Sequence, residues 1–105
     1  MPKRYENKRH LAWVHDFPCV LRADGKCSGG VQAHHLLKPW EGPRGMSLKA
    51  SDRNLIPLCM AHHTALHMRG NEKAFFSEVI GDDEFGQIIA KALWFLSPHN
   101  MDELG

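Results

Sequence analysis

The distribution of apolar positions changes along the chain from helical spacing to short continuous runs, and each pattern predicts its own kind of element. Residues 7–15 carry Leu11 and Val14 at helical spacing. This helix should end before Pro18, because the residue that precedes a proline is disfavoured in the helical region. Three short apolar runs have the length and composition of strands: residues 19–21, 31–37 and 54–58. The first half of the chain therefore predicts an α+β fold.

The second half predicts three helices. The first covers residues 60–68 and ends at Gly70, and the second covers residues 72–80. A third helix starts from a cap at Asp82 or Asp83 and ends at Leu96. The side of this helix that we expect to face inward consists of Phe85, Ile88, Ile89, Ala92, Phe95 and Leu96. The last two helices contain no motif with an evident chemical role, so we expect them to pack against the core.

Between the second and third apolar runs lies a loop of sixteen residues, 38–53. Prolines and glycines are spaced through it, and irregular segments of this length are often functional. Trp40 could stack on a nucleic-acid base from this loop, but a position capping the core is favoured. For Glu41 and Asp52, a place at a turn or on the surface is favoured over a place in a metal shell.

The composition is that of a small globular domain. The 105 residues are 43% apolar and 24% charged, which predicts one domain over residues 1–105. A domain of this size buries a limited core, so a bound metal would add useful stability. We expect a cytoplasmic protein without membrane contact, because the sequence has neither a long apolar run nor an export leader. The three cysteines cannot all pair within one chain, and metal ligation suits them better than disulfides.

Charge is distributed unevenly along the chain. Residues 1–53 carry ten Lys and Arg against five Asp and Glu, a balance of +5, whereas residues 54–105 carry three against seven, a balance of −4. A basic first half can contact nucleic-acid phosphates, although ordinary surface charge is the alternative for any single residue. The candidate phosphate contacts are Lys38, Arg44, Lys49 and Arg53.

Three cysteines and one histidine form the first candidate site. Cys59 and His62 have the spacing of a zinc knuckle, and three thiolates with one imidazole make a closed tetrahedral site, which is structural. Cys19 and Cys27 are separated by seven residues, a longer loop than usual, and the turn signal at residues 24–25 is expected to close it. The alternative is three buried, reduced cysteines beside a surface histidine. The predicted zinc ligands are Cys19, Cys27, Cys59 and His62.

A second group combines four histidines with an asparagine: His34, His35, Asn54, His63 and His67. His63 and His67 are four residues apart, so on a helix they share one face and can bind one ion. From Asn54 the sequence reads N-L-I-P-L-C-M-A-H-H-T-A-L-H. It resembles the motif N-L-x-x-L-C-x-x-C-H-x-x-x-H of zinc-stabilised HNH nucleases, with His62 in place of the second cysteine. The chain is also similar in overall appearance to small phage and prophage HNH proteins, and the resemblance covers about residues 19–67.

The resemblance implies a small ββα-metal (His-Me finger) core at residues 19–70, with a structural Zn²⁺ and flanking helices at both ends. Residues 71–97 would then be a helical extension. The location that it implies is the cytoplasm of a bacterial cell or of a phage-infected host.

Roles for the second group follow from the same resemblance. His34, with His63 and His67, would hold a catalytic divalent cation, which could be Mg²⁺, Mn²⁺, Ni²⁺ or Zn²⁺. His35 would be the general base that activates water. Asn54 would orient His35 by accepting its other ring proton and would also fix the hairpin. The cation would stabilise the transition state and the leaving oxygen. Adjacent residues of a strand point to opposite faces, so His34 and His35 need a twist or bulge to serve one site. Exchanged roles for these two histidines stay open.

The sequence thus predicts a metal-dependent HNH endonuclease, a hydrolase that cuts phosphodiester bonds in DNA, with double-stranded DNA as its partner. One alternative is a zinc-stabilised nucleic-acid-binding module that does not cleave. Another is an accessory subunit in phage recombination or packaging that needs a phage protein partner, which the small net charge of +1 favours. A homodimer formed through the C-terminal helices is a further alternative.

Overall fold

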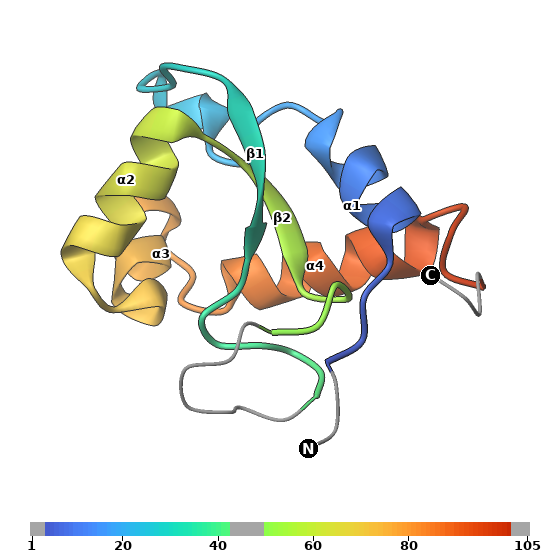
Figure 1. Ribbon diagram of the computed structural model, residues 1–105. Coiled ribbons are helices and arrows are strands. Elements are labelled where there is room, and N and C mark those ends of the chain that lie inside the picture. Colours follow the sequence, from blue (N-terminus) through green and yellow to red (C-terminus); the bar gives the residue numbers. More distant parts are fainter. Residues whose placement is uncertain (1–3, 43–49, 102–105) are drawn as a thin grey trace.

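The computed structural model describes residues 4–42 and 50–101 (Figure 1). Within these residues the chain forms four α-helices, one short 3-10 helix and one two-stranded antiparallel sheet. The α+β class predicted from the sequence is confirmed. In chain order the elements are α1 (Lys8–His15), η1 (Arg22–Asp24), β1 (Val31–His35), β2 (Leu55–Cys59), α2 (Met60–Arg69), α3 (Glu72–Ile80) and α4 (Phe85–Leu96).

The hairpin of β1 and β2 runs through the centre of the molecule (Figure 1). Helix α1 lies on one side of it and α2 with α3 on the other, while α4 crosses behind and packs against β2 and α3. The strand register pairs His34 with Ile56 and His35 with Leu55 without an extra residue in either strand. The two neighbouring histidines therefore leave β1 on opposite faces.

Most helix boundaries follow signals in the local sequence. The side chain of Asn7 caps α1 by accepting a hydrogen bond from the backbone N–H of His10 at 3.0 Å. Asn71 caps α3 in the same way through the N–H of Ala74. Helix α2 ends at Gly70, whose φ of 74° is a left-handed conformation that glycine adopts without strain. The predictions for these three helices are confirmed.

The strand predicted for residues 19–21 is wrong. Leu21 donates its backbone N–H to Sγ of Cys19 at 3.4 Å, so the chain bends around the sulfur and continues into η1. Only the N–H of Val20 reaches the hairpin, where it donates to the carbonyl of Pro57 at 3.0 Å. The apolar run is buried, as a strand would be, but it serves to place Cys19.

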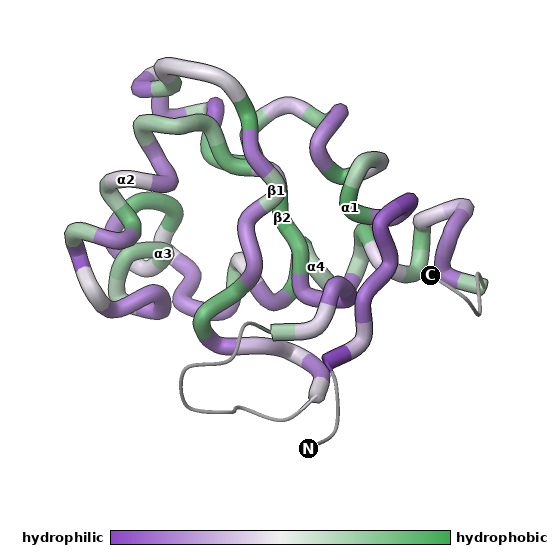
Figure 2. Tube along the Cα trace, in the orientation of Figure 1, coloured by the Kyte–Doolittle hydropathy of each residue, from purple (hydrophilic) through white to green (hydrophobic). Residues whose placement is uncertain are grey.

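The hydrophobic core forms between the hairpin and the helices. All five residues of β2 are buried, and the strand is largely green in Figure 2. Phe76 of α3 and Leu66 of α2 are almost fully buried against it. Trp40 packs against the same core, and its indole N–H donates to the carbonyl of Arg53 at 2.7 Å, in agreement with the core-capping position.

The inward face predicted for α4 is largely wrong. The buried residues are Gly86, Ala90 and Trp94, whereas Phe95 is 62% exposed. A Cβ on Gly86 would lie 2.7 Å from Phe76, so the helix approaches the core most closely where its residues are small. Nearly every side of α4 is apolar, and periodicity therefore could not select the face. No helix within residues 4–42 and 50–101 is long and apolar enough to cross a membrane.

Candidate metal centres

The first candidate centre brings together Cys19, Cys27, Cys59 and His62, whose ligand atoms all lie within 4.8 Å of one another. Nδ1 of His62 lies 3.1 Å from Sγ of Cys59, 3.5 Å from Sγ of Cys19 and 3.7 Å from Sγ of Cys27. In a tetrahedral zinc site, bonds of about 2.0–2.3 Å hold neighbouring ligand atoms about 3.5–3.8 Å apart. The donor set and its dimensions fit a structural metal.

Local structure places these four ligands. Cys59 ends β2 and caps α2, with its Sγ accepting the backbone N–H of His62 at 3.4 Å. The loop between Cys19 and Cys27 closes through η1 and through Gly25, whose φ is 74°. The turn that was expected at residues 24–25 is therefore present, and the longer spacing is no obstacle.

Asp24 supports this centre from within the loop. Its Oδ2 lies 2.7 Å from Nε2 of His62, which leaves Nδ1 of that ring facing the three sulfurs. Burial alone would lower the pKa of His62, but the hydrogen bonds to Asp24 and Cys59 outweigh it and raise the pKa. A carboxylate behind a ligating histidine fixes the orientation and tautomer of the ring.

The second candidate centre joins His34 of β1 to His63 and His67 of α2, again with ligand atoms within 4.8 Å of one another. Nε2 of His63 lies 3.1 Å from Nε2 of His67. The set is open on one side, since His34 is buried, His63 half-buried and His67 exposed. Burial, followed by the two neighbouring rings, lowers the pKa of His63, so its ring is neutral and can offer a lone pair. Three histidine ligands leave positions on an ion for water and a substrate oxygen.

Glu72 is a member of this region that the sequence analysis missed. Its Oε2 lies 3.0 Å from Nε2 of His34, and both side chains are almost fully buried. The first residue of a helix is a common place for an acid, because the helix dipole favours negative charge there. Nothing in the local sequence distinguishes Glu72 from an ordinary residue of that kind, and only the tertiary structure brings it to His34.

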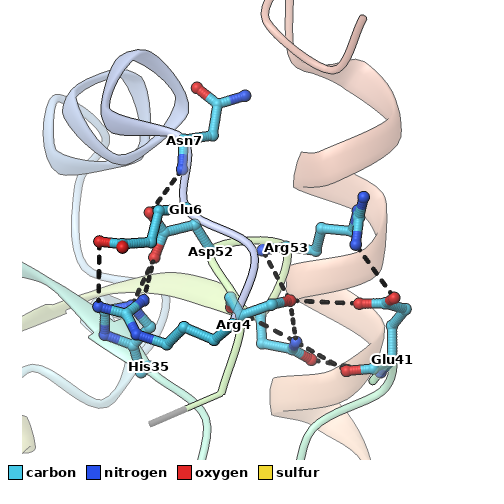
Figure 3. A network of polar contacts seen from close by, with 9 residues as sticks. Arg4, Glu6, Asn7, His35, Glu41, Asp52 and Arg53 are labelled. Carbon is cyan, nitrogen blue, oxygen red and sulfur yellow. Dashed lines mark hydrogen bonds and ion pairs between the residues drawn. The ribbon is translucent and has the colours of Figure 1, made fainter. Parts of the chain in front are cut away.

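His35 lies on the other face of β1, in a separate polar network (Figure 3). Its Nε2 is 2.7 Å from Oδ1 of Asp52, which also accepts from Nη1 of Arg4 at 3.0 Å. Oδ2 of Asp52 accepts the backbone N–H of Asn7 at 2.8 Å. Burial would raise the pKa of Asp52, but its bonds to His35, Asn7 and Arg4 lower it.

Two expectations about this network are wrong in part. Asp52 lies at a turn, as expected, but it is not on the surface: it is 3% exposed and holds His35. Asn54, expected to orient His35, instead organises the loop: its Oδ1 accepts the N–H of Trp40 at 2.8 Å and its Nδ2 donates to the carbonyl of Glu41 at 3.0 Å. Asn54 precedes β2 and its side chain is fully buried, so it fixes the entry to the hairpin, which agrees with the other role expected for it.

Two of the four candidate phosphate contacts, Arg44 and Lys49, lie outside the described residues. The guanidinium of Arg53 is engaged inside the protein, with Nη1 3.1 Å from Glu41 and its centre 3.9 Å above the ring of Tyr5. Lys38 is half-buried after β1, and its backbone N–H donates to Glu72. Arg4, which lies beside His35, is the basic side chain that the structure adds to this neighbourhood.

The fold and these two groups define a small α+β protein with a closed candidate metal centre and an open one. The chain belongs to a family described as "Protein of unknown function (DUF968)", whose match covers residues 1–85. It is also 34% identical, over 67 residues, to "Uncharacterized protein YdfU" of Escherichia coli (strain K12). That similarity covers 62% of this chain and 17% of the relative, so the chain spans less than a fifth of the relative's length. No solved structure matches.

Proposed function

We propose that this protein is a metal-dependent endonuclease of the HNH type that hydrolyses phosphodiester bonds in DNA. One observation carries the proposal: His34, His63 and His67 lie together on a unit of two strands and one helix. The Cys/His centre lies at the start of that helix, α2. In this proposal β1, β2 and α2 form the ββα-metal core. The order of these elements along the chain and the spacing of the histidines on them support the proposal. Cys19, Cys27, Cys59 and His62 hold Zn²⁺.

The open group of three histidines holds the catalytic cation. Neutral imidazoles suit several divalent ions and leave the bound ion its full positive charge. When bound, the ion supplies charge stabilisation to the phosphate and to the leaving oxygen. His67, which is exposed at the edge of the group, lies on the side from which a phosphate would approach.

His35 is the general base, and Asp52 is its positioning residue. The carboxylate of Asp52 accepts the proton on Nε2, which leaves the lone pair of Nδ1 to take a proton from water. His34 and His35 flank the backbone of one strand, and β1 pairs on one side only within the described sheet. A phosphate that lies across the outer edge of β1 would contact the ion on one face of the strand and His35 on the other. His34 and His35 could then serve one site without a bulge in β1.

Arg4 and Lys38 supply positive charge close to that edge. Nη1 of Arg4 lies 3.5 Å from Nε2 of His35, and Lys38 follows the end of β1. A guanidinium binds phosphate oxygens in a fixed planar geometry. In this proposal Arg4 contacts the phosphate next to the scissile one, and double-stranded DNA is the substrate.

The test is cleavage of supercoiled plasmid by the purified chain in EDTA and then in Mg²⁺, Mn²⁺, Ni²⁺ or Zn²⁺. The proposal expects nicking or linearisation that depends on the added ion and is lost in His35→Ala. His15→Ala is the matched control, because His15 is exposed on α1 and has no assigned role. Equal cutting by His35→Ala and the unaltered chain would remove His35 as the base, and absence of cutting with every ion would contradict the proposal.

One observation favours a second candidate, a nucleic-acid-binding module that does not cleave alone. Within the described contacts His35 faces Asp52 and Arg4, whereas the three clustered histidines lie on the opposite face of β1. A module of this kind would bind DNA with an affinity that falls steeply with salt and would leave the plasmid intact with every ion. Gel-shift titrations at two salt concentrations, run beside the cleavage assay, separate the two candidates.

A further inference from the structure

We propose that Glu72 selects the tautomer of His34 and thereby makes Nδ1 the nitrogen that binds the catalytic ion. The inference rests on the proposed function in so far as it takes the three-histidine group to hold that ion. It adds α3, an element with no recognisable motif, to the candidate centre. Glu72 is a positioning residue in this account.

The contact between Glu72 and His34 is buried and direct. Oε2 of Glu72 lies 3.0 Å from Nε2 of His34, and the two side chains are 3% and 2% exposed. Water therefore has little access to either group, and the pair must satisfy its hydrogen bonds internally. The ring of His34 also packs edge-on against the rings of His63 and His67, with centroids 5.1 Å and 5.7 Å away.

The carboxylate of Glu72 is itself held in place. The backbone N–H of Leu37 donates to both of its oxygens at 3.0 Å, and the N–H of Lys38 donates to Oε1 at 3.0 Å. These N–H groups belong to the chain directly after β1, so one side chain anchors both the end of the strand and the ring of His34. With these donors in place the carboxylate cannot turn away without leaving buried N–H groups unpaired.

Both oxygens of Glu72 already accept backbone N–H groups, so the side chain is placed as an acceptor toward His34, and Nε2 of His34 carries the proton. A neutral imidazole has one protonated nitrogen, and its lone pair then lies on Nδ1. Metal ions bind the nitrogen that has the lone pair. Glu72 therefore prepares His34 for the ion before the ion arrives, as Asp24 does for His62 in the closed centre.

The substitution Glu72→Gln reverses this choice with almost no change of shape. The amide has one oxygen, and the N–H groups of Leu37 and Lys38 require it as their acceptor. The NH₂ group then faces Nε2 of His34 and donates to it, which moves the ring proton to Nδ1 and blocks that nitrogen. Glu78→Gln is the matched control, because Glu78 lies on the same helix, is exposed and contacts Arg69.

The experiment uses the full chain loaded with one equivalent of Zn²⁺, which the thiolate centre takes first. Imidazole nitrogen NMR of the ¹⁵N-histidine-labelled protein, with His34 assigned by loss of its signals in His34→Gln, reads the tautomer directly. Calorimetric titration with Ni²⁺ reads the affinity of the open group. We expect the Nε2–H tautomer in the unaltered chain and in Glu78→Gln, and the Nδ1–H tautomer in Glu72→Gln with an affinity for Ni²⁺ reduced about tenfold to hundredfold.

Three results would overturn the inference: an Nδ1–H tautomer in the unaltered chain, unchanged Ni²⁺ affinity in Glu72→Gln, or lost affinity with an unchanged tautomer. The last result would make Glu72 a direct ligand. The spectrum of the unaltered chain decides the tautomer even if Glu72→Gln does not fold. A correct tautomer and tight Ni²⁺ binding without plasmid cleavage would contradict the nuclease proposal and leave the role of Glu72 standing.

Discussion

The two candidate centres share helix α2 but differ in the surroundings of their ligands. Cys59 and His62, at the start of the helix, are 2% and 4% exposed, and four protein ligands enclose the space between them. In the other centre, His63, the residue directly after His62, is half-buried, His67 is exposed, and only three ligands face the space between them. A closed set of four stabilises a fold, whereas an open set of three leaves room for water and substrate. One short helix can therefore serve both purposes from adjacent positions.

The centres also differ in the origin of their supporting carboxylates. Asp24 lies in the loop between two ligands of the closed centre, so its position follows from the chain that forms that centre. Glu72 reaches the open centre from α3, and its contact with His34 depends on how α3 packs against the hairpin. The closed centre is in this sense local, while the open one depends on the tertiary fold.

Removal of a ligand from the closed centre should have the largest effect. Cys59→Ser is expected to lose one zinc per chain and to lose cooperative folding, because a structural zinc of this type contributes on the order of 10 kcal/mol and a domain has only about 5–15 kcal/mol in total. Zinc content by mass spectrometry and thermal unfolding by circular dichroism measure both. Unaltered folding with one zinc fewer would show that the closed centre does not stabilise the fold.

Removal of a ligand from the open centre should leave the fold intact and abolish activity. His67→Ala is expected to lower the rate of plasmid nicking at least about a hundredfold, since loss of an outer-shell partner alone costs up to about that factor. The midpoint of thermal unfolding should move by less than about 4 °C, because the side chain is exposed. His15→Ala should change neither quantity. Loss of stability in His67→Ala equal to that in Cys59→Ser would erase the distinction between the centres.

A buried histidine outside both centres should respond to pH in its own way. Burial lowers the pKa of His10 from 6.5 to about 4, against an opposing effect of Asp52 and with a smaller contribution from His99. Because the folded-state pKa is depressed, the stability from neutral His10 is present above pH 6.5 and is lost as the pH falls toward 4. Relative to His10→Gln, the unaltered chain should lose about 2 kcal/mol between pH 6.5 and pH 5.

Denaturant unfolding of both proteins, with zinc saturating throughout, measures this difference. Equal pH dependence in the two chains would mean that His10 does not titrate in this range.

The smallest effect is expected at Asp52. Asp52→Asn removes the carboxylate that holds His35. If His35 is the base, as proposed, this substitution should lower kcat about tenfold with little change in KM, because Asp52 would act through the base and not on the substrate. Steady-state cleavage of a short duplex separates the two constants. A rise in KM alone would assign Asp52, together with Arg4, to substrate binding.

Local sequence was sufficient for much of the fold and for the ligand pairs within one element. The predicted ranges of α1, α2 and α3 agree with the structure, because the ends of these helices depend on contacts over a few residues, such as the caps at Asn7 and Asn71. The local sequence was insufficient to predict the conformation of residues 19–21 or the buried face of α4, because an apolar run is compatible with more than one structure. In the first case the sulfur of Cys19 bends the chain, and in the second Gly86 and Ala90 fit closest to Phe76.

What the sequence alone determined is the set of candidate ligands on α2, because the fixed rise and turn of a helix place His63 and His67 on one face wherever the helix lies. Only the tertiary structure decided which carboxylates contact the two histidines of β1. Glu72 reaches His34 from 38 positions along the chain, and Asp52 reaches His35 from 17. No local pattern encodes such contacts, because they arise when the helices and the loop pack against opposite faces of the same strand.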